Sequence, residues 1–254
     1  MPRASTGESV LSRGIRIIES FDGAHESLSV SEIATRAGLH VATASRLVEE
    51  LVQHGWLARD PGRRVHLGIH LWEVVTRAAP TRSLREAALP VMEDLRKVMG
   101  HHVQLAVLEA AEVLFLERVE APGAVVNFSR IAERLPAHAS SAGLVLLAYA
   151  SPERQERALV SGLEKFTDAT LTDPVSLRRT LAEVRRQGYA LLRGHIHEDA
   201  AGISVPLRSL DGSVVAALSL IVPNDRAALA RVPILQAAAL TIARSMAVVA
   251  PPSH

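Results

Sequence analysis

The chain has 254 residues, with 28 lysines and arginines against 27 aspartates and glutamates and a net charge of +1. The length allows two domains, and a hydrophobic content of 48% predicts a folded protein with adequate cores. The absence of cysteine excludes disulfides, thiolate catalysis and thiolate metal sites. Because the charges nearly cancel, any attraction for nucleic acid must come from their placement rather than from their total.

The first ten residues, MPRASTGESV, lack the apolar segment of a secretory signal. No apolar run reaches the roughly 18 residues that a membrane span requires. We therefore expect a cytoplasmic protein that does not contact a membrane. Apolar residues at helical spacing predict a first helix from Ser9 to Phe21.

Residues 29–57, SVSEIATRAGLHVATASRLVEELVQHGWL, predict two short helices joined by a tight turn. Ser29 and Glu32 form a capping box that begins the first helix. Gly38 ends this helix, because glycine adopts the left-handed conformation without a steric penalty. The second helix is expected to begin near Val41.

Short hydroxyls and one guanidinium occupy the outward face of the second helix, at Thr43, Ser45 and Arg46. Such groups reach phosphates and base edges when a helix lies in a major groove. The alternative is an ordinary helical hairpin whose polar face is only solvated.

A β-hairpin with a basic tip is predicted directly after the second helix, with its turn at residues 60–63. Its tip carries Arg59, Arg63 and Arg64. This order of elements is typical of a winged helix-turn-helix, whose wing meets the DNA backbone or the minor groove. The hairpin therefore favours DNA binding, with surface solvation as the alternative for Ser45 and Arg64.

The segment IHLWEVVTRAA, residues 69–79, predicts an apolar helix that Pro80 ends. It is too apolar to stand free, so we expect it between domains or at a dimer contact. The expected domains are a winged helix-turn-helix domain at 9–68, a linker helix at 69–82 and a second domain at 83–250.

Within the second domain, Ser83 and Glu86 predict another capping box, which begins a helix that Gly100 ends. Pro90 is expected to kink or interrupt that helix. Helices are also expected within 133–151, at 153–161, at 176–187 and from Ala227 to about Val249. Short apolar runs predict strands at 103–108, 113–118, 124–128, 189–192, 203–207 and 214–222. This order describes an α+β domain built on an antiparallel sheet.

No catalytic motif appears in the sequence: there is no G-x-S-x-G, no P-loop and no metalloprotease helix motif. Three glutamates, Glu112, Glu117 and Glu120, are spread over one predicted hairpin without a partner opposite them. We therefore expect neither an enzyme nor a cofactor.

Five histidines of the second domain could converge on one site: His101, His102, His138, His195 and His197. Residues i and i+2 of a strand share a face, as a chelating pair requires. Spacing alone is weak evidence, and ordinary loop or effector-contacting histidines are the alternative. No metal site is assigned, but a metal- or pH-responsive regulator remains the alternative function.

Taken together, these motifs resemble the IclR family of bacterial transcription regulators. The N-terminal match is SVSEIATRAGLHVATASRLVEELVQHGWLARDPGRRVHLG. The second domain matches in LREAALPVMEDLRKVMGHHVQLAVLE, LPAHASSAGLVLLA, LAEVRRQGYA and VPLRSLDGSVVAALSLIVP, so the resemblance covers about residues 9–249. It implies a winged helix-turn-helix domain, a linker helix and a GAF-like effector-binding domain whose antiparallel sheet is flanked by helices.

Members of this family are typically homodimers or homotetramers that bind operator DNA under the control of a small organic effector. The resemblance favours a repressor over an activator. It places the DNA-contacting positions at Thr43, Ser45, Arg46, Arg63 and Arg64. A dimer would present its two recognition helices to major grooves about 34 Å apart, or a multiple of that.

The effector pocket of the family falls between the loop at 136–144 and three strands of the sheet. The corresponding positions here are Ala137, Leu144, Leu192, Gly202, Ser204, Ser219 and Ile221. Several of them are apolar where relatives that bind small keto acids present polar groups. An apolar pocket holds a bare carboxylate poorly, because desolvation of the charge is not compensated. We therefore expect an aromatic or alicyclic acid as effector; the alternative is a pocket that its own side chains fill.

Overall fold

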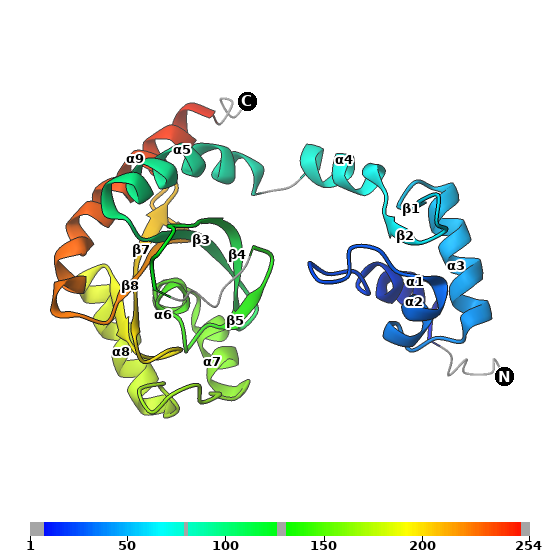
Figure 1. Ribbon diagram of the computed structural model, residues 1–254. Coiled ribbons are helices and arrows are strands. Elements are labelled where there is room, and N and C mark those ends of the chain that lie inside the picture. Colours follow the sequence, from blue (N-terminus) through cyan, green and yellow to red (C-terminus); the bar gives the residue numbers. More distant parts are fainter. Residues whose placement is uncertain (1–7, 79–80, 126–130, 250–254) are drawn as a thin grey trace. The chain divides into compact units, whose positions relative to one another are not determined.

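The computed structural model describes residues 8–78, 81–125 and 131–249. The chain divides into two compact units, Met1–Pro80 and Thr81–His254, each with its own core. Figure 1 shows the elements of both units.

The N-terminal unit is a winged helix-turn-helix. Ser29 and Glu32 form the predicted capping box at the start of the second helix, and Gly38 adopts a left-handed φ of 61° after it. Leu28 pairs with Val65, so a third short segment joins the wing. The elements are α1 (Val10–Ile18), α2 (Val30–Arg36), α3 (Val41–Gln53), β1 (Leu57–Arg59), β2 (Val65–Leu67) and α4 (Ile69–Ala78).

The apolar stripes of the first three helices and of the wing meet in one core. Alternation along the wing and helical spacing along α1 to α3 bring these side chains together. The buried members are Ile17, Leu28, Ile33, Ala37, Leu47, Val48, Leu57 and Val65. This core fixes α3 with its polar face outward.

The C-terminal unit is built on a six-stranded sheet in which every neighbouring pair is antiparallel, in the order β5-β4-β3-β8-β7-β6. The α+β fold with an antiparallel sheet is therefore confirmed. The strands are β3 (His102–Glu109), β4 (Glu112–Val119), β5 (Arg134–Pro136), β6 (Ala190–Arg193), β7 (Ala200–Arg208) and β8 (Val214–Pro223).

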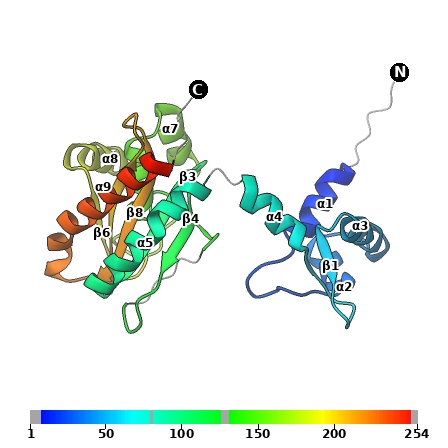
Figure 2. The same cartoon turned by 90° about the horizontal axis from the view of Figure 1, so that it is seen from above.

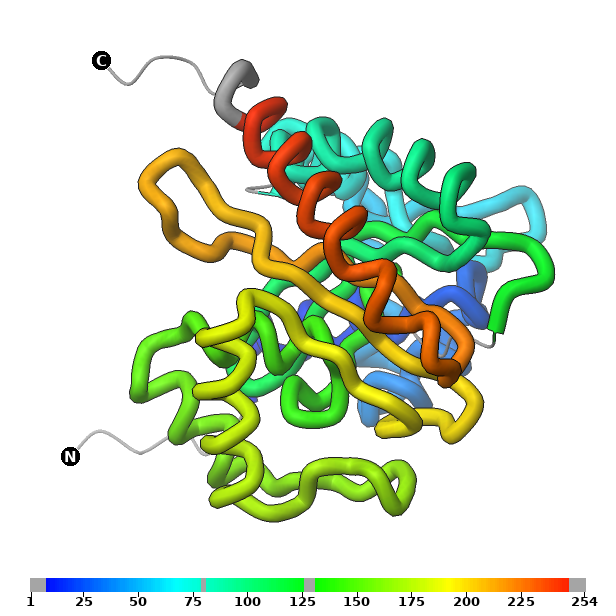
Figure 3. Tube along the Cα trace, turned by 90° about the vertical axis from the view of Figure 1, so that its left-hand side faces the viewer, coloured from blue at the N-terminus to red at the C-terminus, as the bar shows by residue number. Residues whose placement is uncertain are grey.

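Helices cover both faces of this sheet. On one face, α5 (Arg82–Met99) and α9 (Val232–Val249) lie side by side (Figures 2 and 3). On the other face, α6 (Ser141–Ala148) packs with α8 (Pro174–Gln187), and α7 (Pro152–Val160) lies against α6. A core lies on each face, so the sheet is buried on both sides over its central strands.

The capping box of Ser83 and Glu86 expected for α5 is wrong. Its N-cap is Thr81, without a side-chain bond, and the Glu86 carboxylate accepts a hydrogen bond from Arg82 Nε at 2.8 Å instead of capping the helix. The helix also continues through Pro90 to Met99. Ala87, Ala88 and Met92 are buried around the proline, so packing against the sheet outweighs the lost backbone hydrogen bond.

The strand expected at 124–128 is not observed at Ala124 and Val125, and the rest of it lies outside the described residues. The chain turns at Gly123, which has a φ of 74°, and Ala124 N–H donates to Ala121 O. The outer strand on this side is β5, which pairs with β4. It has only three residues and ends in Pro136, so the sequence carries little strand pattern there.

The segment Arg226–Met246 is long and apolar enough to cross a membrane by length and composition alone. It comprises a 3₁₀ turn, η1 (Arg226–Arg231), and most of α9. Leu235 and Ile242 are fully buried in the core beneath α9. One apolar face of this helix therefore packs on the sheet, while Ile234 and Leu240 are 44% and 62% exposed.

Candidate DNA interface and effector pocket

The outward face of α3 carries the polar side chains predicted for DNA contact. Ala44, which is fully buried, faces the core, while Ser45 and Arg46 are exposed and Thr43 is partly exposed. The Arg46 side chain is 64% exposed, and its Nη1 lies 3.9 Å from Glu50 Oε2. A surface ion pair this open and this long is worth little, so Arg46 is available for a phosphate or a guanine edge.

The wing tip contains a backbone outlier at Arg63. Its φ is 62°, a left-handed value, although the neighbouring Gly62 does not adopt one. Arg63 N–H donates to Asp60 O at 2.9 Å, and Asp60 N–H donates to Arg64 O at 3.0 Å. A type I turn followed by a left-handed residue is a common three-residue hairpin loop, and that position normally favours glycine or asparagine. Arginine is thus held at the tip against its backbone preference.

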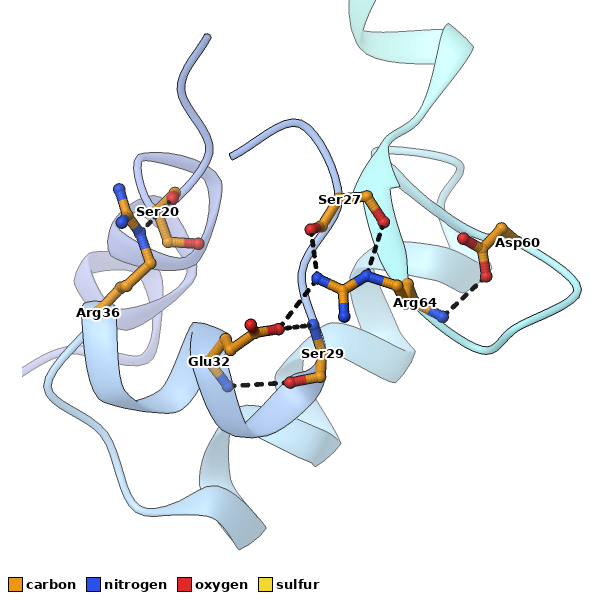
Figure 4. A network of polar contacts seen from close by, with 7 residues as sticks. All are labelled: Ser20, Ser27, Ser29, Glu32, Arg36, Asp60 and Arg64. Carbon is orange, nitrogen blue, oxygen red and sulfur yellow. Dashed lines mark hydrogen bonds and ion pairs between the residues drawn. The ribbon is translucent and has the colours of Figure 1, made fainter. Parts of the chain in front are cut away.

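The guanidinium of Arg64 is engaged within the protein (Figure 4). Its Nη2 lies 2.7 Å from Ser27 O and 3.1 Å from Glu32 Oε2, and its Nε lies 3.2 Å from Ser27 Oγ. Glu32 also caps α2 by accepting the Ser29 N–H, and these bonds hold the pKa of Glu32 below its usual value. Arg64 therefore ties the wing to the start of α2, whereas Arg63 at the tip is exposed.

A pocket lies between the sheet and the N-terminal end of α6. It encloses about 560 Å³ of space not filled by protein atoms, its open mouth included. The sheet supplies its floor, and the loop between β6 and β7 supplies another wall. Most of the surface of the pocket is apolar, and a few polar groups interrupt it, as is typical of small-molecule sites.

The structure brings together four of the seven residues predicted for effector contact, since the pocket is lined by Leu192, Gly202, Ser219 and Ile221. The other three lie behind its wall. Ala137 and Leu144 are fully buried in the core beneath α6, and Ser204 is fully buried between two pocket serines.

Residues outside the seven predicted effector contacts form the larger part of the lining, and Ala139–Ala142 among them belong to the predicted pocket loop at 136–144. Gln104 lies directly opposite Ser219 in the pairing of β3 with β8, and this register cannot be read from either strand alone. The serine pair at the start of α6 could have been found from the sequence, because Ser140 is the N-cap and serine is favoured at that position. The additional lining residues are Gln104, Phe115, Leu135, Ala139, Ser140, Ser141, Ala142, His195, Ile196, His197, Ala200 and Ala201.

Three buried serines form a chain of hydroxyls along one side of the pocket. Ser204 Oγ lies 2.7 Å from Ser141 Oγ and 2.6 Å from Ser219 Oγ. Three hydroxyls joined by two hydrogen bonds retain one proton, which an end of the chain can donate into the pocket. The chain therefore supplies a polar contact that a ligand can share.

The N-terminus of α6 adds donors at the same place. The Gly143 and Leu144 N–H groups donate to Ser140 Oγ and Ser140 O. Within the described part of the chain, the Ser141 and Ala142 N–H groups have no acceptor. Two free amide donors at the positive end of a helix favour a carboxylate.

Two of the five candidate histidines, His195 and His197, line the pocket. His102 and His138 are structural: His102 Nδ1 accepts the Ala121 N–H and its Nε2 donates to Val125 O, and His138 Nε2 lies 2.9 Å from Glu164 O. Among the residues that the structure describes, His101 Nδ1 is buried without a hydrogen-bond partner, and burial lowers the pKa of His101. In the described ranges no three His, Cys, Asp or Glu side chains are placed to hold a metal ion.

Known protein families match both the DNA-binding unit and the unit that contains the pocket. The family model described as the IclR helix-turn-helix domain matches residues 10–61. The family model described as the bacterial transcriptional regulator IclR C-terminal domain matches residues 76–248. The chain belongs to the IclR family. It is therefore a DNA-binding transcriptional regulator and not an enzyme, and the family binds small-molecule effectors.

Named relatives of this IclR-family protein include both regulators and repressors. The HTH-type transcriptional regulator XynR of Escherichia coli is 31% identical over 82% of this chain and 83% of its own length. The transcriptional repressor IclR of Escherichia coli is 32% identical over 71% of this chain and 67% of its own.

A solved structure of an IclR homolog from Microbacterium hydrocarbonoxydans is 44% identical, with a TM-score of 0.90 over 94% of this chain and 100% of that one. That homolog was crystallised in complex with 4-hydroxybenzoate.

Proposed function

We propose that this IclR-family protein is a cytoplasmic repressor, active as a homodimer or homotetramer, whose operator affinity is controlled by an aromatic carboxylic acid. The observation that carries the proposal is the make-up of the pocket. Apolar side chains such as Phe115, Leu192 and Ile221 form its walls, while the free amides of Ser141 and Ala142 and the serine chain lie at one end.

This arrangement suits an aromatic acid better than a small keto acid. A carboxylate at the N-terminus of α6 would receive two amide hydrogen bonds and the favourable end of the helix dipole. An aromatic ring would cover the apolar walls, where a two- or three-carbon acid would leave them exposed to water. The relative that binds 4-hydroxybenzoate supports this class of effector.

We assign DNA contact to Thr43, Ser45 and Arg46 in α3 and to Arg63 at the wing tip. The Arg64 guanidinium positions the wing by donating to Ser27 O and Glu32 Oε2. We propose that Arg64 also contacts a DNA phosphate while it keeps these two partners. This assignment does not depend on total charge, because Arg46 on α3 and Arg63 at the wing tip are exposed.

The proposal of a dimer rests on the linker helix. In α4, Ile69, Trp72 and Val75 are 72%, 63% and 55% exposed, and the helix has no buried residue. Apolar side chains this exposed mark an interaction surface. We propose that α4 pairs with the same helix of a second copy, and that effector binding favours one arrangement of the pair.

The test begins with selection of a specific operator from genomic fragments, followed by titration of aromatic acids against the protein–operator complex. We expect a benzoate to change operator affinity by about 5- to 150-fold, the usual range of allosteric coupling. Arg46→Ala is expected to weaken operator binding. Gly202→Ala serves as the matched pocket variant, because its new Cβ would lie 2.6 Å from Ser141 Oγ.

Gly202→Ala is expected to bind the operator normally but to respond poorly to the acid. The proposal is wrong if no aromatic acid changes operator affinity or melting temperature, or if glyoxylate or pyruvate binds tightly. Including zinc and a chelator in the same titration tests the metal-responsive alternative.

A further inference from the structure

The two histidines that line the pocket are two residues apart, and their rings have opposite hydrogen-bond partners. His195 Nδ1 lies 3.1 Å from Arg193 O. A carbonyl oxygen only accepts, so this nitrogen carries the proton. His197 Nδ1 lies 3.3 Å from the backbone nitrogen of Asp199, whose N–H donates to it, so this nitrogen carries no proton.

A neutral imidazole has one N–H and one acceptor nitrogen, and the partner of Nδ1 determines which is which. In His195 the remaining nitrogen, Nε2, is therefore the acceptor. In neutral His197, Nε2 is the donor. Burial lowers the pKa of His195 below its usual 6.5, which keeps its ring neutral at physiological pH. The His195 ring thus carries an acceptor nitrogen at this wall of the pocket.

The position of His195 is fixed from two sides. Thr167 Oγ1 donates to Gly194 O at 2.6 Å, and Thr170 Oγ1 donates to His195 O at 2.6 Å. Thr170 is itself buried, and Gly194 adopts a φ of 70° that permits the turn. With its backbone held by threonines and its ring held by Arg193 O, His195 is preorganised, so binding costs little conformational entropy.

The serine and backbone groups at the N-terminus of α6 differ from the His195 ring. Amide N–H groups donate only, and each serine hydroxyl can turn to donate or to accept. Gln104, which also lines the pocket, carries both an acceptor oxygen and donor N–H groups on one side chain. A ligand carboxylate, which only accepts, is satisfied at the N-terminus of α6 but offers nothing to His195 Nε2. A second ligand group that carries a proton is needed there, since an apolar atom in its place would leave the nitrogen desolvated without a partner.

We propose that His195 Nε2 accepts a hydrogen bond from a hydroxyl or amino group on the ring of the effector, so that the pocket selects donor-substituted aromatic acids. This inference rests on the proposed function, because it assumes an aromatic acid in this pocket. It makes His195 a specificity-determining residue. His197 Nε2, as a donor, would donate to a methoxy oxygen as readily as to a hydroxyl oxygen, so the two histidines can be distinguished by their ligands.

The experiment is calorimetric titration of the full-length protein with 3- and 4-substituted benzoates carrying hydroxyl, amino, methoxy or methyl groups. For substituents at the same ring position, the hydroxybenzoate and the aminobenzoate are expected to bind about tenfold tighter than the methylbenzoate, as one hydrogen bond implies. The methoxy acid, which has no proton to donate, is expected to behave like the methyl acid.

In His195→Phe the hydroxybenzoate and the methylbenzoate are expected to bind with about equal affinity. Binding of the methylbenzoate to this variant would show that the pocket is intact. His195→Gln retains an acceptor and should keep part of the preference. His197→Phe is the matched control and should keep all of it.

Three results overturn the inference. Wild type could bind hydroxyl and methyl acids alike, the preference could survive in His195→Phe, or the methoxy acid could bind as well as the hydroxyl acid. Failure of every benzoate to bind is a different result, since it refutes the proposed effector class itself.

Discussion

Two glycines inside helices should respond oppositely to alanine. Gly143 lies in the first turn of α6, and a Cβ there would lie 2.1 Å from Ala137 O and 2.4 Å from Ala137 Cα. Gly14 lies in the middle of α1, and a Cβ there would meet nothing within 4 Å. Gly143→Ala should therefore destabilise the protein, and Gly14→Ala should stabilise it.

The magnitudes follow from the contacts. Because the atoms that meet the new methyl at Gly143 are backbone atoms, the pocket loop must move by more than about 1 Å. Overpacking of this kind costs up to about 3 kcal/mol, and the helix propensity of alanine returns about 1 kcal/mol. The net loss of about 2 kcal/mol corresponds to about 4–8 °C in the melting of the C-terminal unit. Gly14→Ala should gain up to about 1 kcal/mol.

The assay uses the placement of the tryptophans. Both of them, Trp56 and Trp72, lie in the N-terminal unit, so selectively excited fluorescence follows that unit while far-UV circular dichroism follows both. Gly143→Ala should lower the melting transition seen by circular dichroism but not the one seen by fluorescence. Gly14→Ala should raise the fluorescence transition.

The reasoning is refuted if Gly143→Ala melts at or above the wild-type temperature, because the pocket loop would then yield to the methyl at little cost. Effector affinity gives a second measurement, since the loop that must move carries Ala139 and Ser140 of the pocket wall. Effector binding should weaken in Gly143→Ala and stay unchanged in Gly14→Ala.

Four further predictions concern single side chains. Ser204→Ala removes two buried hydrogen bonds and should cost about 1–3 kcal/mol, measured by urea unfolding of the C-terminal unit. Arg46→Ala should weaken specific operator binding by about 1–3 kcal/mol in fluorescence anisotropy, with an unchanged circular dichroism spectrum. The preference for hydroxyl-bearing acids should hold at neutral pH and disappear in calorimetry as the pH falls through the lowered pKa of His195, because the protonated ring has no acceptor. Arg63→Gly should raise the melting temperature of the N-terminal unit and weaken DNA binding.

The DNA-binding unit could be predicted from the sequence almost element by element, because the rules that form it are local. The capping box of Ser29 and Glu32 and the left-handed Gly38 all act within about ten residues. Arg64 shows the limit of this reasoning. Its charge and its place after the turn were visible, but the acceptors that hold it come from Ser27 and Glu32, more than thirty residues earlier.

The pocket was predictable only in part, because it is assembled from segments far apart in the chain. Leu192, Ser219 and Ile221, which the resemblance implied, line the pocket, but the resemblance could not show that Leu144 turns into the core beneath α6. Which face of a short, uniformly apolar helix meets the ligand depends on tertiary packing. For the same reason the sequence left open whether α5 would continue through Pro90: the local cost of the proline was known, and the stabilisation from burial around it was not.

Arg63 shows how function and stability compete at one residue. A non-glycine residue in the left-handed conformation costs about 1–2 kcal/mol, and such strain persists where the position serves a function. Glycine would relieve the strain at Arg63 but would remove the guanidinium, while asparagine tolerates the conformation and also lacks the charge. If both variants gain stability and lose DNA affinity, with a salt dependence reduced by about one phosphate contact, the charge explains why arginine is kept. If they gain stability and bind DNA as well as wild type, Arg63 is not a DNA contact, and the wing acts through its shape alone.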